Sequence, residues 1–213
     1  MNPLNIIKFI AEKKPEQYSI EQIYKKSNLL PVPIDNAYEN ENGKQGKWKI
    51  KDTMYTFKNN IKDGPFIIYN RDNTIIEKGH FSNGNKDGEF ERYHRNGKLN
   101  VKYFIKNGLL NGLYFVYDEK GNIIDKITYK DGKENGESIS YYNNGNIQKK
   151  SYYINGKVNG EFETYHINGQ PHIKCFVKDE KVDGIRYVYN DDGSLKGKLL
   201  YDNGVLLEKL PIN

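Results

Sequence analysis

The sequence contains a single cysteine, Cys175, so it can form neither an intrachain disulfide nor a cysteine-based zinc cluster. It also lacks any run of about 18 apolar residues, the length that a membrane-spanning helix requires. The residues that follow Met1 lack a basic n-region and have only a broken apolar patch. We therefore expect a cytoplasmic protein. An exported form, from which a signal has been processed, is the alternative.

Apolar residues are scarce as well: 36% of the residues are hydrophobic, and the mean hydropathy is −0.87. Tyrosine dominates the aromatic residues, with 18 tyrosines and one tryptophan. Because a tyrosine ring can pack while its hydroxyl stays near water, this composition favours a thin sheet over a thick, dry core. The net charge of +5 favours acidic partners but is too small to indicate nucleic-acid binding.

Glycine recurs six times at a spacing of 24 residues, and a tyrosine follows each of these glycines five positions later. Such a period indicates one supersecondary unit stacked on copies of itself. The repeat glycines are Gly64, Gly88, Gly112, Gly136, Gly160 and Gly184. The repeat tyrosines are Tyr69, Tyr93, Tyr117, Tyr141, Tyr165 and Tyr189.

Each repeat reads as strand, turn, strand, turn. Three of the turns that follow the tyrosines contain Asn-Gly (96–97, 144–145 and 168–169), which favours type I′ hairpins. The other turn carries glycine in most repeats, but Asn60 and Glu180 replace it twice, and we expect distorted loops there. The predicted fold is all-β: an elongated, twisted, single-layer antiparallel meander of tandem 24-residue β-hairpin repeats.

The two ends depart from the repeat. Residues 1–39 have helical apolar spacing interrupted by Pro15, which predicts a short helical N-terminal cap and a linker. Residues 40–213 form the predicted array, with a C-terminal capping segment. We expect Leu206, Leu207 and Leu210 to fold back over the last edge of the sheet.

The unit Phe81-Ser-Asn-Gly-Asn-Lys-Asp-Gly-Glu-Phe-Glu-Arg-Tyr-His-Arg-Asn-Gly97 resembles the MORN repeat. Within that family it is similar to the variant in bacterial YwqK-type antitoxin proteins. The resemblance covers about residues 40–204 and does not extend to residues 1–35. It implies an interaction protein, because MORN-like repeats occur in scaffolds, membrane-associated proteins, enzyme appendages and antitoxins.

Two expectations concern packing within the array. The repeat glycine lets an aromatic ring of the neighbouring strand lie against the backbone. The repeat tyrosines are expected to stack on one another along one face.

A lysine stands fourteen residues after each repeat glycine, and the hairpin places it opposite the residue three after that glycine. Because these lysines should lie about 10 Å apart, they predict a basic row. One interpretation is that the row docks an acidic protein surface. The other is that the aliphatic stems of the lysines cover the tyrosine rings. The candidate partner-binding residues are Lys78, Lys102, Lys126, Lys150, Lys174, Lys198, Glu91, Phe115, Glu163 and Tyr187.

Catalytic and metal-binding patterns are missing from the sequence. His94 and His166 occupy equivalent repeat positions far apart, and only His172 is expected near His166. No carboxylate or thiolate at ligand spacing completes a metal site, so we expect no metal, no cofactor and no enzymatic activity. Cys175 is expected as an inert buried thiol near Phe162.

Three functions remain open. The first is a non-catalytic, antitoxin- or immunity-like inhibitor that occludes a partner protein, such as a toxin or a nuclease-type enzyme. The second is an envelope or anionic-lipid-associated scaffold that uses the lysine row. Nucleic-acid binding is less expected, because bases need exposed aromatic rings between the lysines. Open sheet edges would also permit homo-oligomers.

Overall fold

The computed structural model describes residues 31–212, and every regular element in that range is a β-strand. This confirms the all-β prediction. The predicted helical cap falls on residues 1–30, which lie outside the described residues. The described part of the chain offers no helix with the length and apolar character needed to span a bilayer.

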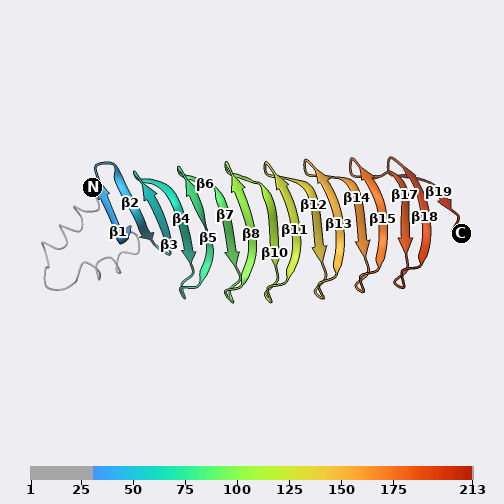
Figure 1. Ribbon diagram of the computed structural model, residues 1–213, viewed down its shortest axis with the longest axis horizontal. Helices are drawn as coiled ribbons and strands as arrows, with labels where there is room; N and C mark the ends of the chain where they lie inside the picture. Colours follow the sequence, from blue (N-terminus) through green and yellow to red (C-terminus); the bar gives the residue numbers. More distant parts are fainter. Residues whose placement is uncertain (1–30, 213) are drawn as a thin grey trace. The chain divides into compact units, whose positions relative to one another are not determined.

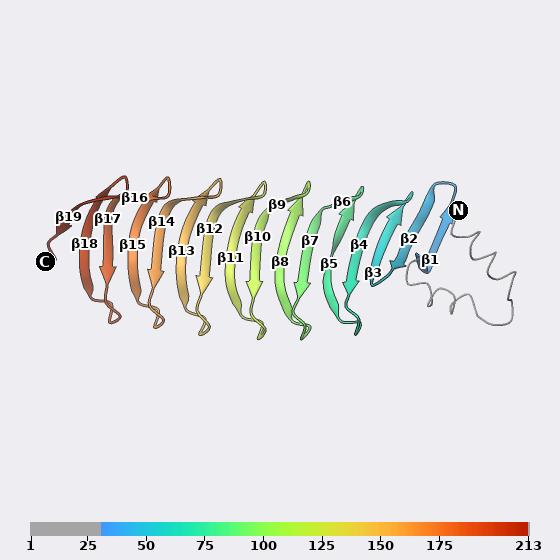
Figure 2. The ribbon, with the colours of Figure 1, turned by 180° about the vertical axis from the view of Figure 1, so that it is seen from behind.

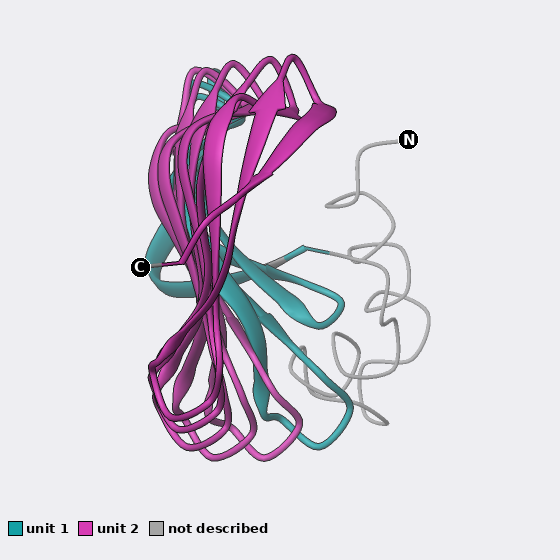
Figure 3. Ribbon diagram, turned by 90° about the vertical axis from the view of Figure 1, so that its right-hand side faces the viewer, with its two compact units in different colours: residues 1–85 teal, residues 86–213 magenta. Residues whose placement is uncertain are grey.

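The chain divides into two compact units, residues 1–85 and 86–213 (Figure 3). In the first unit, consecutive strands pair antiparallel from β1 to β5. The segment predicted as a linker forms β1, which pairs with β2. The strands are β1 (Val32–Asn40), β2 (Gly43–Ile50), β3 (Thr53–Lys58), β4 (Ile61–Tyr69) and β5 (Ile75–Ser82), and the short β6 (Asn85–Lys86) spans the junction.

The second unit is an open antiparallel meander in which each strand pairs with its neighbours in sequence (Figures 1 and 2). Short β9 and β16 continue into β10 and β17, with one residue between. The strands are β7 (Gly88–Tyr93), β8 (Leu99–Lys106), β9 (Leu109–Leu110), β10 (Gly112–Tyr117), β11 (Ile123–Lys130), β12 (Lys133–Tyr141), β13 (Ile147–Ile154), β14 (Lys157–Tyr165), β15 (Pro171–Lys178), β16 (Lys181–Val182), β17 (Gly184–Tyr189), β18 (Leu195–Asp202) and β19 (Val205–Leu210).

The Asn-Gly turns that follow the repeat tyrosines are not the predicted type I′ turns. After Tyr93, the Gly97 N–H donates to the His94 carbonyl, and Gly97 has a positive φ while Asn96 does not. This is a type I turn followed by a left-handed glycine, which suits the longer connection from residue 94 to residue 98. The type I′ turns are the shorter ones, such as Asn107-Gly108, where φ is 52° and 80°.

Asn60 and Glu180 do not distort their loops. Their φ values of 63° and 65° lie in the left-handed region, as do the values of 79° to 86° at the glycines of the equivalent turns. An asparagine tolerates this left-handed conformation, whereas a glutamate adopts it at a cost. The loop geometry is therefore kept, and Glu180 bears local strain.

The repeat glycine is required by backbone conformation more than by a neighbouring ring. Its φ is positive in all six repeats, for example 118° at Gly136. A Cβ at Gly136 would meet Thr128 rather than an aromatic ring, and one at Gly112 would meet nothing within 4 Å. At Gly160, by contrast, a ring does lie close, that of Tyr152.

The core is a row of rings on one face of the sheet. In the second unit Phe90 is fully buried and stacks on Tyr103, which stacks on Tyr114. The repeat tyrosines lie in another row, where Tyr93 pairs with Leu99 and Tyr117 with Ile123. The expectation that they stack on one another is wrong, because successive repeat tyrosines are two strands apart.

The C-terminal segment extends the sheet instead of covering it. Residues Val205–Leu210 form β19, which pairs with β18. Leu206 and Leu207 are 45% and 59% exposed, so the predicted fold-back is wrong. β19 is the last strand of the second unit that the structure describes.

Candidate interaction surface

The lysine row has the cross-strand register that the sequence predicted. Each repeat lysine lies directly opposite the residue three after its glycine. The six pairs are Ile67–Lys78, Glu91–Lys102, Phe115–Lys126, Ile139–Lys150, Glu163–Lys174 and Tyr187–Lys198. The first pair lies in the first unit and the other five lie in the second.

Within the second unit, the row continues through the strand on the other side of each lysine. Lys102 also pairs with Phe115, and Lys126 also pairs with Ile139. Opposite residues share a face of the sheet, and alternate residues along a strand do too. The side of the second unit that carries Lys102, Lys126, Lys150, Lys174 and Lys198 is called the lysine face below.

Ion pairs offset much of the charge of this row. The Lys102 ammonium lies 2.9 Å from a carboxylate oxygen of Glu89 and 3.5 Å from one of Glu91. The Glu89 hydrogen bond raises the pKa of Lys102 above its ordinary value. Lys126 pairs with Glu137 at 3.7 Å, and Lys174 with Glu163 at 3.1 Å. The row therefore alternates in charge and is not purely basic.

Two lysines outside this row place their ammonium groups over aromatic rings. The Lys62 ammonium lies 3.8 Å from the centre of the Tyr55 ring. Lys86 lies 5.0 Å from the centre of the Phe90 ring. Lys62 and Lys86, each two residues before a repeat glycine, thus cover rings in a way similar to the one that we considered for the lysine row.

Two repeats add a tyrosine to the Glu–Lys pair. The Tyr93 hydroxyl donates to Glu91, and the Tyr165 hydroxyl donates to Glu163. Burial alone would raise the pKa of Glu163, but Tyr165 and Lys174 outweigh it and lower that pKa below its ordinary value. Burial, together with the bond to Glu163, raises the pKa of Tyr165 to about 12.

A second row on the lysine face carries exposed apolar side chains. Phe104, Leu113, Tyr152 and Phe176 are 40%, 44%, 45% and 48% exposed. They stand one or sixteen residues after a repeat glycine, two positions along the strand from the lysine row. The register that located the lysines would also have placed these residues in one row, but the sequence analysis did not consider it.

The histidines make local structural contacts. The Nε2 atoms of His94 and His166 lie 2.9 and 3.1 Å from the carbonyl oxygens of Tyr117 and Tyr189. As expected, His172 lies beside His166, with 4.6 Å between the ring centres. Burial, with the neighbouring His166 and Arg186, lowers the pKa of His172.

Cys175 lies on β15 opposite Phe162, as expected, but it is only half-buried. Because it is adjacent to Lys174 in the strand, its side chain lies on the face opposite the lysines. Burial raises the pKa of its thiol, which lowers its nucleophilicity.

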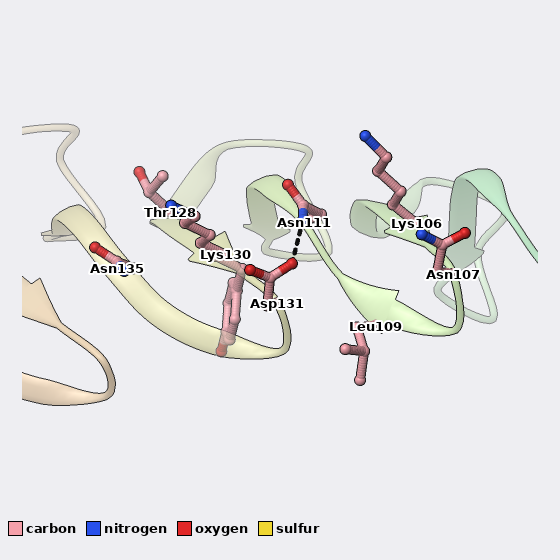
Figure 4. Close-up of a pocket in the computed structure, with 9 residues that line it drawn as sticks. Lys106, Asn107, Leu109, Asn111, Thr128, Lys130, Asp131 and Asn135 are labelled. Atoms are coloured by element: carbon pink, nitrogen blue, oxygen red, sulfur yellow. Dashed lines mark hydrogen bonds between the residues drawn. The ribbon is translucent and has the colours of Figure 1, made fainter.

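A hollow of about 640 Å³ lies in the second unit at the turns that follow β8 and β11 (Figure 4). Its one carboxylate, Asp131, accepts a hydrogen bond from Asn111 at 3.3 Å. Lys106 and Leu109 point to opposite sides of the turn (Figure 4). Among residues 31–212, no group of three or more histidine, cysteine or acidic side chains could hold a metal ion.

The family model of the MORN repeat variant matches residues 86–107, 110–131, 134–155 and 182–203. Four repeats of the second unit are therefore MORN repeat variants. No curated protein matches the chain.

Two solved structures resemble part of the chain. One is a crystal structure of an S. aureus TarM mutant in complex with fondaparinux, alpha-GlcNAc-glycerol and UDP, 13% identical with a TM-score of 0.28. The other is a crystal structure of TarM, 16% identical with a TM-score of 0.26. Each match covers 73% of this chain, but the chain spans only about a quarter of their length, 27% and 26%. Similarity this low does not bear on function.

Proposed function

We propose that this chain, built on MORN repeat variants, is a non-catalytic protein-binding module that inhibits a partner protein by covering its surface. The partner would be a toxin or a nuclease-type enzyme, as expected for a protein of the YwqK antitoxin type. The proposal rests on one observation: exposed apolar side chains form a row on the lysine face beside the ion-paired lysines.

Such a row suits a protein partner. Exposed aromatic side chains that lie together mark interaction sites, and aromatic residues are enriched at the centres of interfaces. The ion pairs of Lys102 with Glu91 and of Lys174 with Glu163 hold the polar side chains of the face in defined positions, because each glutamate also accepts a hydrogen bond from a tyrosine. A pre-ordered surface binds with a smaller entropy cost than a flexible one.

The alternative, a scaffold on anionic lipid, depends on the charge of the lysines. Glu89, Glu91, Glu137 and Glu163 offset that charge, so the surface offers lipid headgroups little net attraction. Flotation with vesicles of anionic and neutral lipid compares the two functions directly. Salt-sensitive binding to the anionic vesicles alone would favour the scaffold.

The test is affinity capture of the chain from its native host, followed by co-expression. Wild-type chain should recover one dominant protein, and co-expression should suppress the toxicity or enzymatic activity of that protein. The variant Tyr152→Ser/Phe176→Ser should lose the partner. Ile167→Ser removes a side chain that is 64% exposed in a turn and serves as the matched control. Equal capture by both variants would contradict the proposal.

A further inference from the structure

Three exposed glutamates on the lysine face lie directly across from an exposed aromatic ring. The pairs are Glu89–Phe104 on β7 and β8, Glu137–Tyr152 on β12 and β13, and Glu161–Phe176 on β14 and β15. Each ring is at least 40% exposed, and the carboxylate groups are exposed too. The remaining two pairs of the same row in this unit, Leu113–Thr128 and Ile185–Leu200, contain neither a carboxylate nor a ring.

The spacing of the three pairs follows from the strand order. Tyr152 on β13 and Phe176 on β15 are two strands apart, which is about 10 Å. Phe104 on β8 and Tyr152 are four strands apart, or about 19 Å. The three pairs therefore lie in a line about 29 Å long, and the Leu113–Thr128 pair lies between the first two of them.

A carboxylate beside a ring is a combination that binds a cation. An arginine guanidinium can stack on the ring and bond the carboxylate through its N–H groups. The carboxylates of Glu89 and Glu137 already pair with Lys102 and Lys126, at 2.9 and 3.7 Å. These pairs are solvent-exposed, so they contribute little and can be exchanged for an arginine that also gains the ring.

We propose that these three pairs bind arginine side chains on a basic helix of the partner that the proposed function requires. An α-helix presents residues 7 and 14 positions apart about 10.5 and 21 Å from each other on one side. The accumulated mismatch of roughly 2 to 3 Å over the line is within the reach of a long arginine side chain. The target is thus a basic surface, although the chain itself has a net positive charge.

Polyanions fit this row less well than a basic helix. Phosphate groups that approached Phe104, Tyr152 or Phe176 would meet the carboxylate opposite each ring. Binding to single-stranded nucleic acid instead depends on a positive groove along the stacking rings. Binding of single-stranded DNA to these rings is therefore an outcome that would contradict the inference.

The test uses a dye-labelled, alanine-based helical peptide of about 26 residues, with arginines separated by 14 and then 7 positions. Binding to the full chain is followed by fluorescence anisotropy. Phe176→Leu and Glu161→Gln should each weaken binding about two- to fivefold, and changes at separate pairs should multiply. The control is Tyr38→Leu, which removes a ring that is 58% exposed in the first unit, and it should leave binding unchanged.

In the peptide assay, three results would overturn the inference. They are no peptide binding up to about 1 mM, equal binding of a peptide with glutamate in place of arginine, and equal weakening by Tyr38→Leu. Circular dichroism confirms that each variant keeps its strands. If the captured partner still binds Glu89→Gln/Glu137→Gln/Glu161→Gln at wild-type strength, the inference fails while the proposed function stands. If no partner is captured, the proposed function fails whatever the peptide result.

Discussion

Lys102 lies directly across the β7–β8 ladder from Glu91, and its ammonium nitrogen is 3.5 Å from the carboxylate. A second carboxylate, that of Glu89, lies closer still at 2.9 Å. This geometry shows that the lysine row is not purely basic. The lysines order a surface of alternating charge, and the exposed rings beside them provide the apolar contact area that a partner would cover.

The buried row of rings should dominate the stability of the second unit. Phe90 is fully buried and stacks on Tyr103 with 5.4 Å between ring centres. Phe90→Ala should therefore lower the free energy of unfolding by about 3–5 kcal/mol, measured by urea denaturation. Phe176→Ala, on the exposed face, should change it by less than about 1 kcal/mol. Similar losses in both variants would show that the rings on the two faces contribute alike.

Alanine substitutions at two repeat glycines distinguish the cost of backbone strain from the cost of steric crowding. Gly112→Ala should cost about 1–2 kcal/mol, because its φ of 89° disfavours a Cβ but the space is open. Gly136→Ala should cost more, because its new Cβ would also lie 3.1 Å from that of Thr128. Thermal unfolding of the two variants gives the comparison. A larger loss at Gly112 would contradict this account of the repeat glycine.

The type I′ turn at Glu180 offers a stabilising substitution. Glu180→Gly should raise the free energy of unfolding by up to about 1 kcal/mol, because glycine adopts a φ of 65° without strain. The exposed pair with Lys157, 3.7 Å apart, contributes little to be lost. Asn60→Gly is the matched control and should gain less, since asparagine already tolerates the left-handed region. Urea denaturation of both variants measures the difference.

The Glu163–Tyr165 pair predicts a pH dependence with two limbs. Because the folded-state pKa of Glu163 is lowered, its contribution is present above the ordinary value of 4.5 and is lost as pH falls through the folded-state pKa. Because the pKa of Tyr165 is raised to about 12 from 10.0, its contribution is complete below pH 10 and is lost as pH rises toward 12. Tyr165→Phe should remove the alkaline limb, as followed by urea denaturation between pH 9 and about 12. An unchanged alkaline limb would show that the hydrogen bond does not stabilise the fold.

Much of the fold could be predicted because one period fixes the same register six times. Hairpin register depends on loop length, so the pairing of Glu91 with Lys102 holds for every equivalent pair. The turn types could not be assigned in the same way, since both loops contain glycine after asparagine or aspartate. Loop length decides between them, and the Asn96-Gly97 loop is longer than the Asn107-Gly108 loop.

The candidate surface was only partly predictable for a different reason. A sheet with one layer gives no pattern of burial in the sequence that marks one face as the core. Phe90 and Phe104 are both aromatic strand residues of one hairpin, yet the first is fully buried and the second is 40% exposed. The lysines drew attention to the face that also carries the exposed rings, but these rings and the carboxylates opposite them became evident only from the structure.

The most direct test of the central claim is cysteine labelling of the chain with and without its captured partner. Single cysteines are placed in a Cys175→Ser background at Phe104, Tyr152 and Phe176 on the lysine face, and at Arg92 and Lys149 on the opposite face. The account predicts that the partner slows labelling of the first three positions at least tenfold and leaves the other two unchanged. Protection of Arg92 and Lys149 with free labelling of Phe104, Tyr152 and Phe176 would contradict it.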